Sequence, residues 1–294
     1  MNLLDGKKIS KEIKNEIFQI VNELKKNSLR VPHLVTILVG DNPSSASYIK
    51  SKIKACHEVG FKSTHIQLEK DVSQNELLSI ISDMNNDNGV DGFIVQLPLP
   101  DHFDEMKVIE SIDPKKDVDG FHPVNLGKLL IGSDTFIPAT PLGILELIKR
   151  YNIETSGKEI IVLGRSNIVG KPISICLMQK AYPGDATVTI LHSKSKNIKE
   201  RLLQADIIIA AIGKPNFVTA DMVKNGAVVI DVGINSIPDP NGEKQYKLVG
   251  DVDFDNVAPK CSYLTPVPGG VGLMTVACLL SNTLKAYRNF NEKR

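Results

Sequence analysis

The sequence predicts an α/β protein of two domains, in which strands alternate with helices and form parallel sheets. Three observations predict this class. The chain has 294 residues, which is more than a single hydrophobic core usually supports. Short runs rich in Val, Ile and Leu alternate with segments of helical period, an order typical of parallel strands joined by helical crossovers. Two stretches rich in Pro or Gly, 136–141 and 266–270, divide the pattern and are typical of domain junctions.

The first half begins with a helix and continues with three strand-like runs. The expected elements are a helix at 9–24, a strand at 33–39, a helix at 44–59, a strand at 61–68, a helix at 74–87 and a strand at 93–97. Ser44 or Ser45 can cap the second helix, and Gly60 supplies the left-handed position that ends it. Pro98 ends the last strand because proline cannot continue a central ladder.

The second half repeats this alternation and has the character of a mononucleotide-binding α/β domain. Its expected elements are a strand at 159–163, a helix at 170–181, a strand at 187–191, a helix at 197–204, a strand at 206–210, a short helix near 220 and a strand at 227–231. A final helix at about 273–289 is expected to return to the first domain. The expected division is therefore 1–138 with 271–294 for one domain and 139–270 for the other.

Composition excludes several classes of partner. With 35 Lys and Arg against 34 Asp and Glu, the net charge of +1 gives no reason to expect nucleic acid or an anionic membrane. No stretch approaches the roughly 18 apolar residues of a membrane span, and the N-terminus lacks a signal-peptide pattern, so we expect a soluble, cytoplasmic protein with a small-molecule partner. The four cysteines are scattered, without metal-ligand spacing, so we expect reduced thiols and no metal site.

A turn bounded by glycines connects the strand at 159–163 to the next helix. It reads Gly164-Arg165-Ser166-Asn167-Ile168-Val169-Gly170-Lys171-Pro172. Glycine permits a tight turn, and a helix N-terminus offers free N–H groups and positive potential to a pyrophosphate. The spacing is G-x5-G rather than G-x-G-x-x-G, so a phosphate loop and an ordinary βα turn are equally good interpretations of this stretch alone.

The end of the following strand favours NADP over NAD. NAD-binding domains place a carboxylate about 20 residues after the glycines, where it binds the ribose 2′-hydroxyl. Here the strand at 187–191 leads into His192-Ser193-Lys194, which contains no carboxylate. Together with Arg165, which follows the preceding strand, these hydroxyl and cationic side chains suit a 2′-phosphate.

In the first half, Tyr48 and Lys52 lie four residues apart and share one face of the helix at 44–59. The neighbouring apolar stripe consists of Ala46, Ile49, Ile53 and Cys56. Most lysines are simply solvated. Lys52, however, lies at the edge of this stripe, where desolvation would lower its pKa and make it usable as an acid or base near neutrality.

Two further polar positions are ambiguous by themselves. Gln96 lies at the carboxyl end of a predicted parallel strand, where α/β sheets bind ligands, although such a side chain can also simply tie down a loop. Asp117 and Asp119 alternate in the loop 116–120, and loop aspartates are more often turn formers than ligands. Neither signal decides the function alone.

Taken together, six stretches closely resemble the bifunctional methylenetetrahydrofolate dehydrogenase/methenyltetrahydrofolate cyclohydrolase family. They are YIKSKIKA at 48–55, VQLPLP at 95–100, KDVDGFHP at 116–123, GRSNIVGKP at 164–172, DVGIN at 231–235 and TPVPGGVG at 265–272. Their order and spacing extend over nearly the whole chain, so together they are far more specific than any single motif.

This resemblance implies oxidation of 5,10-methylenetetrahydrofolate to 5,10-methenyltetrahydrofolate with NADP, followed by hydrolysis to 10-formyltetrahydrofolate. Such one-carbon metabolism serves purine, methionine and histidine biosynthesis. The resemblance also implies a folate-binding catalytic domain, a Rossmann-like NADP-binding domain and a homodimer. In this reading Lys52 is the catalytic lysine, Gln96 its polar partner, Tyr48 the residue that packs on the folate rings and Asp119 the carboxylate that binds the pterin.

The resemblance further implies residues around both ligands. The implied cofactor positions are Gly164, Arg165, Ser166, Ser193 and Ile234, and the implied further substrate positions are Pro268, Gly269 and Gly270. Two stretches depart from the family pattern. Leu273 stands where the family usually has Pro, and the stretch 179–185 is longer than in many relatives. Neither departure removes a residue with a proposed chemical role.

Two alternatives remain open at this point. In one, the protein is a monofunctional methylenetetrahydrofolate dehydrogenase, and Lys52 only orders the folate. In the other, it is a non-catalytic NADP-binding module with a structural first domain. The second alternative is disfavoured by four residues of ligand-binding type, Tyr48, Lys52, Gln96 and Asp119.

Overall fold

The computed structural model describes residues 1–239 and 245–291, and the side chains of 43–47 lie outside this description. The chain folds into two compact units, each described here by itself. Residues 11–139 and 276–294 form the first unit, and residues 1–10 and 140–275 form the second unit.

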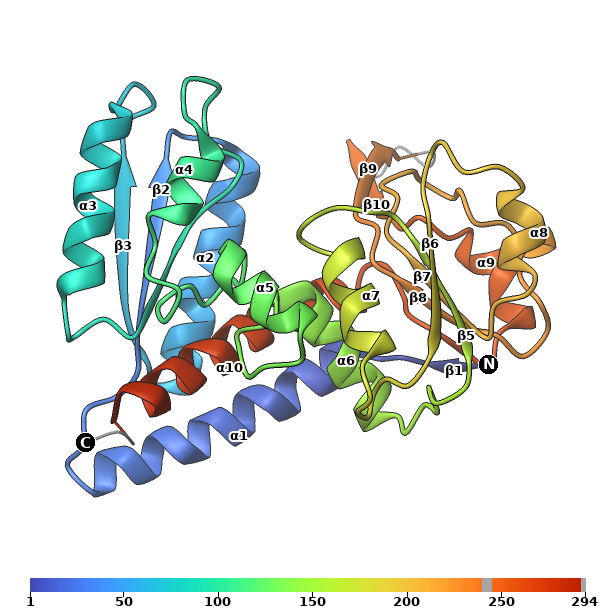
Figure 1. Ribbon diagram of the computed structural model, residues 1–294, viewed down its shortest axis with the longest axis horizontal. Coiled ribbons are helices and arrows are strands. Elements are labelled where there is room, and N and C mark those ends of the chain that lie inside the picture. Colours follow the sequence, from blue (N-terminus) through green and yellow to red (C-terminus); the bar gives the residue numbers. More distant parts are fainter. Residues whose placement is uncertain (240–244, 292–294) are drawn as a thin grey trace. The chain divides into compact units, whose positions relative to one another are not determined.

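The first unit contains a parallel three-stranded sheet in the order β3-β2-β4 (Figure 1). The strands are β2 (His33–Val39), β3 (Lys62–Leu68) and β4 (Gly92–Val95). Its helices are α2 (Pro43–Val59), α3 (Gln74–Asn86), α4 (Glu105–Glu110) and α5 (Pro123–Leu130), together with most of α1 (Gly6–Lys26) and of α10 (Val271–Asn291). All seven residues of β2 are buried, as expected for a parallel strand with both faces covered.

The core of the first unit explains this burial. Alternate residues of β2, such as Val35 and Ile37, pack in one cluster with Leu77 and Ile81 of α3. Residues between them point to the opposite face, where α2 lies against β2 and β3. Because the three strands are parallel, their carboxyl ends lie at one edge of the sheet.

The second unit contains a parallel six-stranded sheet in the order β1-β11-β8-β7-β5-β6 and a separate antiparallel hairpin of β9 and β10 (Figure 1). The strands are β1 (Asn2–Leu3), β5 (Glu159–Leu163), β6 (Thr187–Leu191), β7 (Ile207–Ala210), β8 (Val228–Asp231), β9 (Asn235–Pro238), β10 (Tyr246–Val249) and β11 (Tyr263–Leu264). The helices are α6 (Ala139–Arg150), α7 (Gly170–Met178), α8 (Ile198–Leu202) and α9 (Phe254–Val257), with 3-10 turns η1 (Ala220–Met222) and η2 (Ala258–Lys260).

The first ten residues belong to the second unit, whereas the expected division placed them with 11–138. β1 pairs with β11, and the backbone N–H of Leu4 donates to the carbonyl of Leu264 over 2.9 Å. The Leu4 side chain is fully buried. Two residues are too few to be recognised as a strand by periodicity. Only the tertiary pairing of β1 with β11 therefore reveals that the N-terminal residues belong to the second unit. At the other end, the division between the units falls within α10, after Thr275, rather than at 270.

The predicted helix at 170–181 ends earlier, because α7 stops at Met178. The segment that follows bonds within itself, with the N–H groups of Ala181 and Asp185 both donating to the carbonyl of Gln179. Gly184 is tied down as well, since its N–H donates to Thr155 Oγ1 over 2.9 Å. The longer stretch at 179–185 is therefore a compact connection between α7 and β6.

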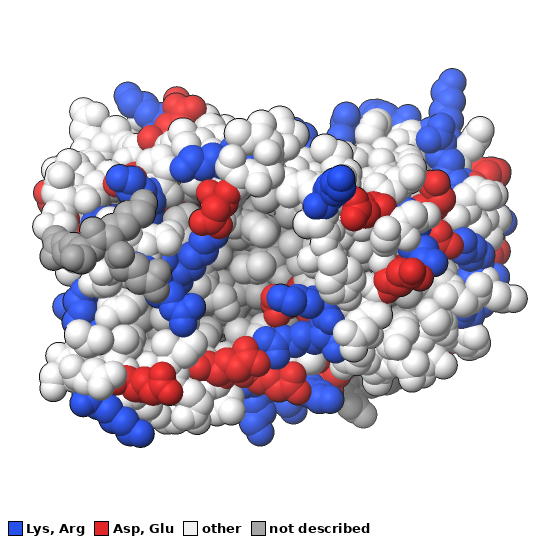
Figure 2. Space-filling view, turned by 60° about the horizontal axis from the view of Figure 1, so that its bottom comes forward, with Lys and Arg blue, Asp and Glu red and all other residues white. Residues whose placement is uncertain are grey.

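Charged side chains are mixed over the surface. In Figure 2, basic and acidic groups are interspersed across the visible face, in line with a net charge of +1. Among the residues that the structure describes, no helix is both long and apolar enough to cross a membrane, and no cluster of His, Cys, Asp or Glu is suited to hold a metal ion. Cys56, Cys176, Cys261 and Cys278 are free and buried.

Candidate functional site

Lys52 lies in the middle of α2 and bonds to Gln96. Its Nζ donates a hydrogen bond to Gln96 Oε1 over 3.0 Å, across 44 residues of sequence. Gln96 Nε2 donates to the carbonyl of Leu97 over 2.8 Å, which leaves Oε1 for the lysine. The backbone of Gln96, directly after β4, is fixed by its N–H bond to the carbonyl of Ile37. Helix α2 and the carboxyl edge of the sheet thus bring together two of the predicted site residues.

Asp119 completes a cluster with these two residues. A parallel bridge between Phe93 and Asp117 attaches the preceding segment to β4. Asp119 is half-buried beside a small cavity with apolar walls, and within the described part of the chain no hydrogen-bond donor reaches its carboxylate. Burial raises the pKa of Asp119, and the charge of Lys52 opposes this shift in part. The carboxylate is therefore a strong acceptor that is available to a ligand.

Burial also lowers the pKa of Lys52, and the charge of Asp119 opposes this shift in part. A low-dielectric surrounding disfavours the ammonium form, so more of the lysine is neutral near pH 7 than in water. A neutral amine that faces a polar cluster can accept a proton from a reacting group. The lysine at the edge of the apolar stripe has the environment that the sequence predicts.

Tyr48 precedes Lys52 by one helical turn, and 44% of the residue is exposed. Its ring is accessible to a planar ligand, although it makes no described contact with Lys52. In the stripe beside it, Ile49 and Cys56 are buried and Ile53 is half-buried. The predicted stripe member Ala46 and the predicted caps Ser44 and Ser45 lie outside the described side chains.

In the second unit, the turn after β5 requires glycine at both ends. Gly164 has a φ of +137°, and a Cβ there would lie 2.1 Å from the carbonyl oxygen of Ala211. A Cβ on Gly170 would lie 2.2 Å from the carbonyl oxygen of Gly164. The backbone therefore folds tightly between β5, β7 and the start of α7. This constraint distinguishes the turn from an ordinary βα connection, in which side chains are tolerated.

The free N–H groups lie in this turn rather than in the first turn of α7, where the sequence led us to expect them. Ser166 Oγ accepts from the N–H groups of Val169 and Gly170, over 3.1 and 3.3 Å, and the Ser166 carbonyl accepts from Lys171. Among the described residues, the N–H groups of 166–168 donate to no protein acceptor. The turn, rather than the start of α7, therefore presents the N–H groups that could bind an anion, and Ser166 shapes it while its hydroxyl hydrogen remains free to donate.

Arg165 and Ser193 follow neighbouring strands of the sheet. The register pairs Leu163 of β5 with Leu191 of β6, so each of the two residues lies two positions beyond a paired residue. Arg165, Ser193 and Lys194 are exposed, and within the described residues their side chains have no hydrogen-bond partner. Two cations and a hydroxyl at one edge of the sheet can bind a phosphate group.

The remaining predicted positions also lie in the second unit. Ile234 follows β8 and is 49% exposed, at the same carboxyl edge as Arg165 because the strands are parallel. In the segment that leads into α10, Gly269 has a φ of +118°, and its carbonyl accepts from the N–H of Lys7. A Cβ on Gly270 would lie 2.6 Å from the carbonyl oxygen of Pro266. Pro268, Gly269 and Gly270 are thus in a different unit from Lys52.

Two buried aspartates that sequence reasoning missed hold the loops at this edge. Asp231 accepts from the N–H groups of Gly233, Asp251 and Val252 over 2.9 to 3.0 Å, and burial raises its pKa to about 6. Asp251 accepts from the N–H groups of 212 and 213 and from Asn235 Nδ2. For Asp231 the available signal was its place at the end of a buried apolar run, which marks a strand end but not the partners of the carboxylate. Asp251 follows the exposed strand β10 and had no such signal.

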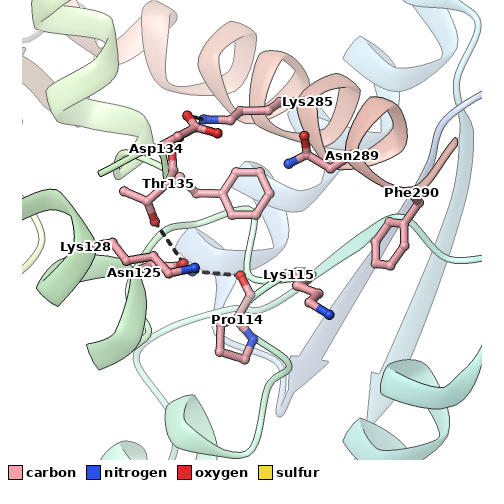
Figure 3. A pocket seen from close by; sticks show the side chains of 10 residues that line it. Pro114, Lys115, Asn125, Lys128, Asp134, Thr135, Lys285, Asn289 and Phe290 are labelled. Carbon is pink, nitrogen blue, oxygen red and sulfur yellow. Dashed lines mark hydrogen bonds and ion pairs between the residues drawn. The ribbon is translucent and has the colours of Figure 1, made fainter. Parts of the chain in front are cut away.

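A pocket of about 540 Å³ in the first unit contains none of the predicted site residues (Figure 3). It lies between the ends of α5 and α10, with Lys128, Lys285 and Asn289 among its lining side chains. Lys285 is paired with Asp134. On the wall of the pocket, Asn125 Nδ2 donates to the carbonyl of Pro114, and Asn125 Oδ1 accepts from Thr135 Oγ1.

A parallel sheet with a glycine-bounded turn that presents free N–H groups between a strand and a helix is characteristic of dinucleotide-binding α/β proteins. In the first unit, Lys52 and the Asp119 carboxylate lie close enough to influence each other's pKa, a pairing suited to acid–base chemistry. Two family models match the chain: the catalytic domain of tetrahydrofolate dehydrogenase/cyclohydrolase over residues 4–119, and the NAD(P)-binding domain of the same family over 138–291.

Individual relatives are similar over almost their full lengths. The bifunctional protein FolD of Porphyromonas gingivalis is 61% identical over 97% of this chain and 96% of its own. The crystal structure of the bifunctional FolD of Campylobacter jejuni has a TM-score of 0.92 at 49% identity, covering 98% of this chain and 99% of its own. The Trypanosoma brucei enzyme, solved with NADP cofactor and an inhibitor, has a TM-score of 0.91 at 37% identity, covering 97% and 96%.

The chain belongs to the tetrahydrofolate dehydrogenase/cyclohydrolase family. This membership confirms the predicted two-domain α/β fold with an NAD(P)-binding domain and the prediction of a bifunctional dehydrogenase and cyclohydrolase. The predicted cofactor NADP agrees with the NAD(P)-binding domain and with the NADP complex of the Trypanosoma relative.

Proposed function

We propose that the chain oxidises 5,10-methylenetetrahydrofolate with NADP and hydrolyses the resulting methenyl cation to 10-formyltetrahydrofolate, with Lys52 as the acid–base residue. The observation on which this rests is the cluster in the first unit. A lysine whose pKa is lowered by burial bonds to Gln96 and lies near the carboxylate of Asp119. Family membership supports the substrate, and the cluster supports the assignment of roles.

Hydrolysis needs a base before it needs an acid. Neutral Lys52 takes a proton from the water that attacks the methenyl carbon, and it later returns a proton to the departing ring nitrogen. A protonated lysine would repel the cationic substrate, so the lowered pKa is required for binding as well as for proton transfer. Gln96 Oε1 accepts from Nζ and keeps the lysine lone pair in one orientation.

The other residues of the first unit bind and orient the folate. Asp119 suits the aminopyrimidinone edge of the pterin, which presents adjacent N–H donors to one carboxylate. Tyr48 offers an exposed ring on which the folate rings can pack.

NADP would be held at the carboxyl edge of the second sheet. The turn from Gly164 to Ser166 takes the pyrophosphate, Arg165 and Ser193 take the 2′-phosphate, and Ile234 contacts the cofactor from the end of β8. When bound, NADP would supply the hydride acceptor for oxidation of the methylene carbon. Hydride transfer needs no protein acid, so the chain contributes position alone to this step.

Lys52→Ala tests the acid–base assignment. General acid–base catalysis contributes about 10²- to 10⁴-fold, so we expect methenyl hydrolysis to fall by at least about 100-fold. An absorbance time course with methylenetetrahydrofolate and either cofactor follows reduced nicotinamide and the methenyl intermediate together. Lys50→Ala, at an exposed position of the same helix, is the matched control. Unchanged hydrolysis would indicate a monofunctional dehydrogenase, and tight NADP binding without turnover would indicate a non-catalytic module.

Arg165→Ala tests the choice of cofactor. A charge-assisted hydrogen bond to phosphate contributes about 1.5 to 3 kcal/mol, so we expect NADP to bind about 10- to 100-fold more weakly while NAD is nearly unaffected. Calorimetric dissociation constants for both dinucleotides measure this difference, with Arg201→Ala as a control at an exposed site of the same unit. An equal loss for the two dinucleotides would contradict a role at the 2′-phosphate.

We also propose that the enzyme acts in the cytoplasm as a homodimer, in one-carbon metabolism that supplies purine, methionine and histidine biosynthesis. Four free and buried cysteines suit a reducing compartment. β6 is an edge strand, and Ile190 on it is 38% exposed, which favours contact with a second copy over exposure to water. Light scattering after gel filtration measures the oligomeric state.

A further inference from the structure

Asp117 is a buried carboxylate to which the proposed chemistry gives no task. It is 2% exposed and lies two residues before Asp119. Its Oδ1 accepts from the N–H of Gly120 over 3.1 Å, and its Oδ2 accepts from the N–H of His122 and from Asn125 Nδ2, both over 2.8 Å. These three donors are neutral, and two of them belong to the backbone immediately after Asp119. The carboxylate therefore closes the turn that contains Asp119.

Asn125, the side-chain donor in this set, has its orientation fixed. The same Nδ2 bonds to the carbonyl of Pro114, and Oδ1 accepts from Thr135 Oγ1 over 2.9 Å (Figure 3). The amide is buried, and because Oδ1 is occupied by a hydroxyl donor, Nδ2 must face Asp117. The contact is thus built into the fold rather than formed by a mobile side chain.

A second side chain holds the turn from the other side. Asn282 of α10 donates from Nδ2 to the carbonyl of Val118 over 2.8 Å and to the carbonyl of Ile137 over 2.9 Å. Asn282 is itself buried. The peptide group before Asp119 is therefore fixed by Asn282, and the peptide group after it is fixed by Asp117.

The backbone of the turn also packs closely against residues 136–138 at Gly120, where only glycine fits. The φ of Gly120 is +74°, and a Cβ there would lie 2.8 Å from the backbone nitrogen of Pro138. The backbone is thus clamped on both sides of a residue whose own carboxylate has no donor among the described residues. A fixed backbone with a free carboxylate is what a preorganised ligand-binding residue requires.

We propose that Asp117 and Asn282 are positioning residues that hold the turn 118–120, so that Asp119 presents its carboxylate to the N–H groups of tetrahydrofolate. This inference rests on the proposed role of Asp119. It gives α10 a task in substrate recognition, because Asn282 reaches the turn across 164 residues of sequence. Both residues act through Asp119 and need no contact with the substrate.

Asn282→Ala and Asp117→Asn, compared with Asp119→Ala, test the proposal. We expect each single variant to bind tetrahydrofolate at least 10-fold more weakly by calorimetry, with the dissociation constant for NADP changed less than twofold. The control is Thr283→Ala, which truncates a buried polar residue of α10 whose hydroxyl bonds only within the helix, to the carbonyl of Leu279. The control should bind tetrahydrofolate within twofold of the wild type.

A double-mutant cycle separates positioning from general damage. In the Asp119→Ala background, Asn282→Ala should weaken tetrahydrofolate binding by less than a further twofold, because the positioned group is gone. A full additional 10-fold loss there, or equal losses for NADP and tetrahydrofolate, would overturn the proposal.

If Asp119→Ala weakens binding and Asn282→Ala does not, the positioning inference alone fails. If Asp119→Ala has no effect, the proposed role of Asp119 fails, and the inference fails with it. Asn282→Ala keeps the cycle measurable should Asp117→Asn not fold.

Discussion

Lys52 owes its lowered pKa to burial, while its charged neighbour Asp119 acts in the opposite direction. Asp119 in turn owes its raised pKa to burial, against the influence of Lys52. The same desolvation thus favours a neutral lysine and a more basic carboxylate, which is the pair of properties that hydrolysis of a cation and recognition of N–H donors require.

Gln96→Glu tests whether the protonation of Lys52 limits hydrolysis. A carboxylate in place of the neutral partner stabilises the ammonium form and raises the pKa of Lys52. Because the neutral lysine is the active form, the rate of hydrolysis should begin to fall at a higher pH than in the wild type as the pH is lowered. At pH 7 we expect a loss of about 10-fold or more.

The measurement is the pH profile of methenyl hydrolysis relative to the wild type. Gln74→Glu adds the same charge to the same unit, at a residue that bonds to the N–H of Asp104, and should leave the profile unchanged. An unshifted profile for Gln96→Glu would show that Lys52 does not titrate in the reaction.

At the scale of elements, the sequence predicts the strands and helices that have a long, clear period. β2, β3, β5, β6 and α3 lie within a residue of their predicted bounds. β2 and β5 are almost wholly buried apolar runs, typical of parallel strands, and α3 begins after the capping residue Ser73. β1, β11 and the hairpin β9–β10 were not predicted. The first two have only two residues each, and β9 and β10 are largely exposed, so none of them forms a buried apolar run.

Substitution of Gly170 tests how closely the start of α7 packs against the turn after β5. Gly170→Ala would force a Cβ against the Gly164 carbonyl, so we expect a loss of about 1 to 3 kcal/mol in the free energy of unfolding and weaker NADP binding. Gly127→Ala in α5 is the matched change, because a Cβ there meets nothing within 4 Å. Removing the backbone freedom of this helical glycine should stabilise the protein by about 0.5 to 1 kcal/mol.

Chemical denaturation of the two glycine variants measures both effects. Because the turn between β5 and α7 is tight, we expect Gly170→Ala to lower the free energy of unfolding and Gly127→Ala to raise it. If both substitutions stabilise, the close approach of Gly170 to Gly164 is not a constraint in solution, and the turn between β5 and α7 is more adaptable than its geometry indicates.

At the scale of the whole molecule, neither end of the chain belongs to the unit next to it in the sequence. Residues 1–10 belong to the second unit, and most of α10 belongs to the first. Leu4 is the clearest case, because it is fully buried and its N–H bonds to the carbonyl of Leu264 in β11.

Leu4→Ala should therefore destabilise the second unit, although the residue lies at the start of the sequence. Truncating a buried leucine costs about 2 to 5 kcal/mol. Hydrogen exchange followed by mass spectrometry should show faster exchange in β8 and β11, with β2 and β4 unchanged. Faster exchange in β2 and β4 instead would place the N-terminal residues with the first unit.

The sequence by itself determined the alternation of strands and helices, the glycine-bounded turn, the family and the residue types of the site, because these depend on local period and on motif spacing. Only the tertiary structure placed Lys52 Nζ on Gln96 Oε1, closed the turn around Asp119 with Asp117 and Asn282, and moved β1 into the other unit. Each of these depends on contacts between distant segments. A side chain's partners and burial, and hence its pKa, are set by neighbours that local sequence does not specify.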